Sequence, residues 1–193
     1  GQFAWVNRAG EIERLDQLKS ATYTRFDLSS NGKKIAVSIA GKRPDIEILD
    51  IQKGSSTKIT TKGMNWWPIW SPDDSKIMFV RAENTARSHQ IIQSNSLGTS
   101  PEETIFSSDS FIGPDDWSSD GDKVAIVDWP KRTGYLDLSK DPVEFKELTS
   151  SEGSSIFGIN FSPNGKWISF SSSIAGGYNC YIAPTDRPDE AQL

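Results

Sequence analysis

The stretch Ser162-Pro163-Asn164-Gly165-Lys166-Trp167-Ile168-Ser169-Phe170 is one of four related nine-residue segments, and these segments decide the fold. The others begin at Ser29, Ser71 and Ser118, so successive copies start 42, 47 and 44 residues apart. Each copy opens with Ser-Pro or Ser-Ser followed by Asn or Asp, which form tight turns, and three copies then carry a glycine that accepts positive φ. Each copy ends in an i, i+2 pair of apolar residues. The segment therefore predicts a hairpin turn that leads into a β-strand.

The spacing of the copies is that of one four-stranded blade of a β-propeller. An apolar residue before each serine ends a first strand, and weaker strand patterns follow the second strand. The residue inside each apolar pair is Ala36, Met78, Ala125 or Ser169. Because these residues are small or apolar, the second strands are expected to be buried on both faces, as stacked blades require. No segment has a useful helical period, so we predict an all-β protein.

The first residues resemble the outer half of a blade, with strands at 3–7 and 11–15 around a turn. We therefore predict a single propeller domain over 1–193, made of a half-blade at 2–16 and blades at 23–61, 66–106, 111–149 and 155–193. In closed propellers the two chain ends share one blade, and this chain stops before it supplies the two inner strands of the half-blade. We therefore expect part of a larger propeller; closure by four blades is the alternative.

The residues carry a resemblance to a known family. The segments Trp70-Ser71-Pro72-Asp73, Trp117-Ser118-Ser119-Asp120-Gly121 and Phe161-Ser162-Pro163-Asn164-Gly165-Lys166 resemble the WSPDG-type, WD-repeat-like repeat of TolB-like propellers, over residues 23 to 183. The resemblance implies a six-bladed ring in a periplasmic or other extracytoplasmic bacterial protein that binds proteins or peptides. Related propellers also cap the catalytic domain of prolyl-oligopeptidase-type peptidases. Unpaired edges at open propeller ends would favour self-association.

Composition narrows the choice of partner. The formal net charge of −5 disfavours a nucleic acid or an anionic membrane surface. No apolar stretch approaches the roughly 18 residues that a membrane helix needs, and the first residues lack signal-peptide features. The single cysteine, Cys180, excludes a disulfide within the chain and is expected to be a small buried hydrophobe.

No motif predicts catalysis, a cofactor or a metal. Two segments starting at Asp27 and Asp116 imitate the beginning of a calcium loop but lack its glutamate, and their residues already serve the hairpin turn. His89 is the only histidine, which excludes a multi-histidine metal centre, and no Gly-x-Ser-x-Gly segment accompanies it. We place His89 at the start of a third strand. Neighbouring carboxylates such as Asp115 and Asp116 are expected to face water or to accept backbone N–H groups.

We predict a non-catalytic scaffold that binds a protein or peptide on its irregular loops or in its central channel. Loops on a rigid scaffold carry function, and arginines with aromatics suit a protein ligand. The candidate residues are Arg43, Trp66, Arg81, Arg87, Phe111, Trp129, Arg132 and Tyr178. The alternative is an accessory propeller that gates or positions substrate for a larger peptidase or receptor-like kinase. A self-contained hydrolase or lyase would need a polar cluster in the channel.

Overall fold

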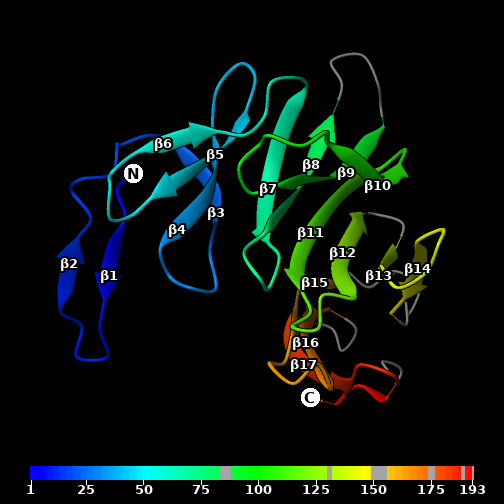
Figure 1. Cartoon of the computed structure of the whole chain (residues 1–193). Coiled ribbons are helices and arrows are strands. Elements are labelled where there is room, and N and C mark those ends of the chain that lie inside the picture. Colours follow the sequence, from blue (N-terminus) through cyan, green and yellow to red (C-terminus); the bar gives the residue numbers. More distant parts are fainter. Residues whose placement is uncertain (83–87, 130–131, 149–155, 174–176, 188–189, 193) are drawn as a thin grey trace.

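The computed structural model describes residues 1–82, 88–129, 132–148, 156–173, 177–187 and 190–192. All 17 elements assigned in this part of the chain are β-strands, arranged in five antiparallel sheets (Figure 1). The sheets follow one another in chain order along an arc, with the N-terminal hairpin at one end and the C-terminal sheet at the other (Figure 1). The predicted all-β propeller architecture is confirmed.

The N-terminal hairpin consists of β1 (Ala4–Val6) and β2 (Ile12–Arg14). Blade 1 consists of β3 (Tyr23–Leu28), β4 (Lys34–Ile39), β5 (Asp45–Asp50) and β6 (Ser56–Lys58). Blade 2 consists of β7 (Met64–Trp70), β8 (Lys76–Ala82), β9 (His89–Asn95) and β10 (Glu103–Ser108). Blade 3 consists of β11 (Phe111–Trp117), β12 (Lys123–Trp129), β13 (Arg132–Asp137) and β14 (Glu144–Glu147). Blade 4 consists of β15 (Ile156–Phe161), β16 (Trp167–Ser172) and β17 (Asn179–Pro184), and Gln192 forms a bridge to Ile182 on its outer edge.

The four nine-residue segments form the predicted turns between the first and second strands. The first serine closes each turn, because its hydroxyl oxygen accepts the backbone N–H five residues later, at 2.9 Å from Lys34 to Ser29 and 3.0 Å from Trp167 to Ser162. Three turns use a glycine at positive φ, and Asp74 adopts a φ of 60° in the second turn. Aspartate is one of the few residues other than glycine that adopt this left-handed conformation. Asp74 also accepts N–H groups from the turn of blade 1, so the turns lie on one side of the disc, called the turn side.

The core lies between successive blades. One cluster joins blades 1 and 2 around Phe79, a second joins blades 2 and 3 around Ile112, and a third joins blades 3 and 4 around Ile168. Leu15 and Leu18 of the N-terminal segment pack on the face of blade 1 that points away from blade 2. These four layers explain why the second strands of blades 1 to 3 are buried on both faces, as predicted.

Blade 4 departs from this expectation. Its second strand, β16, alternates between buried and more exposed residues, whereas the second strands of blades 1 to 3 contain continuous buried runs. Cys180 is exposed, so its prediction as a buried hydrophobe is wrong. Both differences have one cause: among the described residues, no further blade covers the outer face of β16 and β17.

Candidate functional site

The first strands of the blades, β3, β7, β11 and β15, form the inner wall of the propeller. Each is the edge strand of its sheet, and the four lie side by side in the order β3, β7, β11, β15. All four have a register shift, which lies between Trp66 and Ile69 in β7 and between Pro114 and Asp116 in β11. A β-bulge of this kind re-aims side chains and is common at functional positions. The bulges bring Arg25, Trp67 and Asp115 together, here called the channel triad.

Trp67 is held in an unusual backbone conformation. Its φ of 53° lies in the left-handed region, which is costly for a bulky residue. Its N–H donates to the Ser38 hydroxyl oxygen at 3.0 Å. The guanidinium of Arg25 lies 4.4 Å from the centre of its ring, and the ring of Phe111 meets it edge-on with centres 4.9 Å apart. Neighbouring groups therefore fix both the backbone and the ring of Trp67.

Asp115 ties this cluster to two blades. One carboxylate oxygen accepts a hydrogen bond from Arg25 at 3.1 Å. The other accepts the N–H groups of Gly158 and Ile159 in blade 4, at 3.1 and 3.2 Å. Burial raises the pKa of Asp115, and the guanidinium of Arg25 opposes that rise. Among the described residues, Arg25 uses only this one side-chain hydrogen bond, so its other donors are free to meet a ligand.

Two further aspartates lie toward the turn side of the wall. Asp27 accepts the N–H of Trp70 at 2.7 Å, and Asp116 accepts the N–H of Phe161 at 2.7 Å. Each carboxylate thereby links its blade to the next one. Burial raises the pKa of both carboxyl groups, and the charge of Asp27 raises that of Asp116 further.

A cavity of about 270 Å³ opens beside these two carboxylates. Residues from all four blades line it, including Trp70 and Phe161, so it is the turn-side end of the channel. The negative charges of Asp27 and Asp116 face the same space. Chemically, this end of the channel favours a cationic group. No cluster of three or more histidine, cysteine or carboxylate side chains suited to a metal ion occurs in the described ranges.

The predicted ligand-binding residues do not all lie on one surface. Arg43, Trp129 and Tyr178 are exposed, and Tyr178 lies near the ring of Phe157. Trp66 and Phe111 are partly buried. Arg87 lies outside the described residues.

Two of the predicted arginines are paired with carboxylates of the protein itself. Arg81 is 1% exposed and donates to both oxygens of Glu102 at 2.6 Å. Arg132 pairs with the buried Asp128 at 3.3 Å and stacks on Phe145, with its guanidinium 4.1 Å from the ring centre. Arg81 is thus buried in an ion pair within blade 2, whereas Arg132 keeps 38% of its side chain exposed. Sequence reasoning could not find their partners, which are brought near by strand pairing.

His89 begins β9, as predicted. Its ring packs edge-on against Phe111, and its Nδ1 atom is buried with no hydrogen-bond partner among the residues described. Arg25, Trp67 and Asp115 were missed as a group, although the repeat offered a signal: Arg25 and Trp67 both stand four residues before the first serine of their turns.

No helix in the part of the chain that the structure describes is long and apolar enough to cross a membrane. No family model matches the sequence, and no curated protein matches it.

Similar solved structures are propellers. TolB from Acinetobacter baumannii superposes with a TM-score of 0.77 and 22% identity, over 96% of this chain and 46% of that protein. A TolB-type protein from Agrobacterium tumefaciens gives 0.78 and 18%, over 98% of this chain and 67% of that one. A prolyl endopeptidase structure gives 0.68 and 15%, over 99% of this chain and 32% of that protein. The chain thus spans about half the length of the first of these proteins, and the likeness shows the fold.

Proposed function

We propose that this chain, which has the fold of TolB-type β-propellers, is a non-catalytic scaffold that binds a protein or peptide through its inner wall. The channel triad carries this proposal. Residues in sparsely populated backbone conformations cost about 1–3 kcal/mol and persist at ligand sites and active sites. Trp67 is such a residue, and its ring lies beside an arginine whose remaining donors have no partner among the described side chains.

The charges along the wall suggest which ligand groups would bind. Arg25 suits a carboxylate or a peptide carbonyl, because its guanidinium offers several N–H donors in a fixed plane. Asp27 and Asp116 suit a lysine or arginine side chain at the turn-side end. An extended peptide with a cationic residue would satisfy both, and exposed aromatics such as Trp129 and Tyr178 offer contacts outside the channel.

Peptide display tests the proposal. Selection on the wild-type protein should enrich peptides that contain a lysine or arginine. Their affinity should fall at least about tenfold in Trp67→Leu and in the double variant D27N/D116N, as expected when a well-packed aromatic or a charged partner is lost. Lys53→Ala, at a side chain 76% exposed on blade 1, is the control and should leave affinity unchanged. Equal binding to all variants would rule out the channel as the site.

An accessory role in a larger enzyme is the second candidate. It is favoured by the likeness to a prolyl endopeptidase, of which this fold covers 32%. If this role is correct, the peptides that bind the channel should be substrates of a catalytic domain encoded in the same gene. Sequencing of the flanking gene would decide between the two roles.

From the likeness to TolB we propose an extracytoplasmic location. From the exposed apolar side chains we propose association through the ends of the arc. Side chains such as Val6 (64% exposed), Phe26 (60%) and Ile182 (53%) leave apolar surface at both ends. Light scattering should therefore give a mass above the 21.4 kDa of one chain. A stable monomer that resists limited proteolysis would contradict the association, and cell fractionation tests the location.

A further inference from the structure

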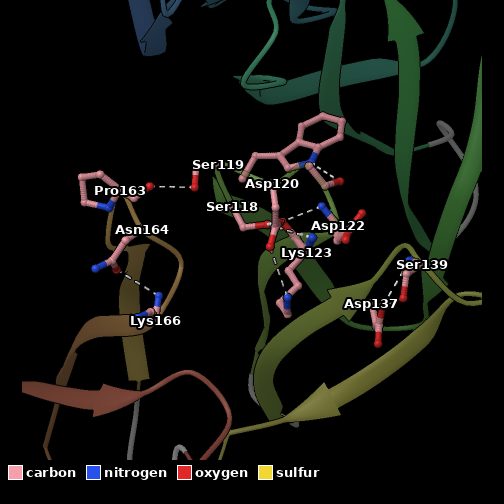
Figure 2. Close-up of polar contacts among 12 residues, drawn as sticks. Ser118, Ser119, Asp120, Asp122, Lys123, Asp137, Ser139, Pro163, Asn164 and Lys166 are labelled. Atoms are coloured by element: carbon pink, nitrogen blue, oxygen red, sulfur yellow. Dashed lines mark hydrogen bonds and ion pairs between the residues drawn. The ribbon is translucent and has the colours of Figure 1, made fainter.

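A groove of about 530 Å³ lies between blades 3 and 4 on the turn side. Blade 3 contributes Lys123 and Tyr135, the start of β16 contributes Lys166 and Trp167, and the segment after β17 contributes Thr185 and Arg187. Figure 2 shows the turns of the two blades facing each other here, joined by the hydrogen bond from the Ser119 hydroxyl to the Pro163 carbonyl at 2.8 Å. The volume is within the range of ligand-binding clefts. This groove is separate from the channel triad.

The groove gathers positive charge in a chain whose net charge is −5. Lys123 has a loose ion pair with Asp120, with 3.6 Å between Nζ and Oδ2. Arg187 is paired more closely, with Nη1 2.8 Å from Glu190 Oε1. Lys166 forms no ion pair with any residue that the structure describes. Among the described residues of the lining, Asp186 is the one carboxylate, and its Oδ1 lies 3.9 Å from Arg187 Nε. Lys166 is therefore the cation at the wall of the groove that has no carboxylate partner in the described part of the chain.

Trp167 stands at a position where the other three copies of the repeat have lysine. Those lysines are Lys34, Lys76 and Lys123, each the first residue of its second strand. Trp167 starts β16 in the same register and is 48% exposed. A lysine at this position is compatible with the turn, so blade geometry does not demand tryptophan. Exposed tryptophan beside arginine is the composition that dominates protein-binding surfaces.

The lining also contains a hydroxyl group without a hydrogen bond. Thr185 is 6% exposed, and its Oγ1 atom is buried with no partner among the described residues. A buried polar atom left unpaired costs free energy. A neighbouring hollow of about 320 Å³ shares Trp167, Pro184 and Arg187 with the groove. Together they form an elongated surface, which suits an extended chain better than a small molecule.

The equivalent region one blade earlier has the opposite character. The hollow between blades 2 and 3 on the same side contains Asp73 and Asp120 beside Lys76. Hydrogen bonds from Ser71 and Ser75 hold the pKa of Asp73 down to about 2, so this carboxylate is ionised at neutral pH. The cationic groove is thus a property of the junction between blades 3 and 4, and not of the repeat.

We propose that this groove binds an extended acidic peptide segment of a protein partner. Lys166 and Lys123 contact its carboxylates, and an apolar residue of the segment packs on Trp167. Three cations with a single free ammonium are too few for a phosphate backbone, which is recognised by a wide basic surface. The site is independent of the channel, so a partner could engage both sides of the disc.

Fluorescence anisotropy with a dye-labelled hexapeptide of three glutamates, one glycine and two leucines tests the proposal. The wild-type protein should bind it and should bind the matched peptide with glutamines at least about tenfold more weakly, because charge-assisted hydrogen bonds are about twice as strong as neutral ones. Lys166→Gln should weaken binding about tenfold and Trp167→Ser about fivefold. Lys76→Gln is the matched control on the same side and should change affinity by less than twofold.

Three results of the anisotropy assay would overturn the proposal. They are the absence of saturable binding up to 1 mM peptide, equal affinity for the glutamine peptide, and equal losses in Lys166→Gln and Lys76→Gln. The circular dichroism spectrum and melting temperature of each variant exclude misfolding as the cause of a loss. The indole N–H signal of Trp167, assigned with Trp167→Phe, should shift on titration; an unmoved signal also contradicts the groove as the binding site. Channel variants such as Trp67→Leu should keep this binding, so failure of one site is distinguishable from failure of the other.

Discussion

Gly113→Ala should damage the channel wall more than its single added methyl group suggests. Gly113 lies in β11 directly against the ring of Trp67. A Cβ atom at this position would lie 1.8 Å from Trp67 Cε3 and 2.0 Å from Cζ3. Ordinary contact begins at 3.4 Å, so the ring would have to retreat by about 1.6 Å. The consequence depends on whether Trp67 can move.

The surroundings of Trp67 oppose that movement. Its N–H is held by Ser38, and Arg25 and Phe111 pack on two sides of its ring. Overpacking a tight site costs about 1–3 kcal/mol. Loss of the arginine stack adds about 0.5–2 kcal/mol. We therefore expect the free energy of unfolding to fall by roughly 2–4 kcal/mol, and the melting temperature to fall by about 5–15 °C.

A double-mutant cycle with Trp67→Leu shows whether the clash with Trp67 causes the loss of stability in Gly113→Ala. If the clash with the indole ring dominates, adding Gly113→Ala to Trp67→Leu should cost at least about 1 kcal/mol less than adding it to the wild type. Urea unfolding followed by circular dichroism gives all four free energies. Gly177→Ala, where nothing lies within 4 Å of the added Cβ, is the control. A cost below about 0.5 kcal/mol for Gly113→Ala, or full additivity with Trp67→Leu, would refute this account of the wall.

Three further predictions concern charge. Glu102→Ala should lower the free energy of unfolding by about 3 kcal/mol in urea titrations, because it leaves the buried guanidinium of Arg81 without its carboxylate partner. The pKa of Glu102 is lowered, so the stabilisation from this ion pair is present above the ordinary glutamate pKa and is lost as the pH falls. Burial raises the pKa of Asp116, so its ionisation lowers the stability of the folded protein as the pH rises. Asp116→Asn should therefore be neutral or stabilising at pH 7. Asp116→Ala should lower the free energy of unfolding by about 1 kcal/mol, because the N–H of Phe161 loses its acceptor. The pKa of Asp73 is held at about 2, so the wild type should lose this stabilisation between about pH 4 and pH 2 in an acid titration, and Asp73→Asn should not.

Much of the fold was predictable because the repeat encodes local structure. The serine of each turn caps its own hairpin, and the apolar pair after it is buried by neighbouring blades. Both are short-range properties of nine residues. The N-terminal hairpin was predictable for the same reason, because its turn at Gly10, which has a φ of 82°, is local and β1 pairs with β2 across it.

The candidate site was harder to predict because its contacts cross between blades. Asp115 accepts hydrogen bonds from Arg25, which is 90 residues away, and from Ile159, which is 44 residues away. No local pattern marks such pairs. The neighbouring carboxylates Asp115 and Asp116 were expected to face water or accept backbone N–H groups, and they do accept such groups, but from the next blade and with most of their surface covered. The ion pair of Arg81 was not predictable because its partner Glu102 lies 21 residues further along the chain, immediately before β10.

Function in a repeat protein should lie where equivalent positions differ. Residues that every blade needs, such as the first serine of each turn, are the same in all four copies. The position four residues before that serine holds Arg25, Trp67, Pro114 or Gly158, and the position five residues after it holds three lysines and Trp167. Blade geometry cannot require four different side chains at one place, so these positions are free to serve a ligand. Exchanging Trp167 for the lysine of the other copies should therefore leave the melting temperature within about 2 °C of the wild type, as expected for an exposed substitution of less than about 0.5 kcal/mol, while peptide binding is lost. A large fall in melting temperature would mean that Trp167 belongs to the scaffold.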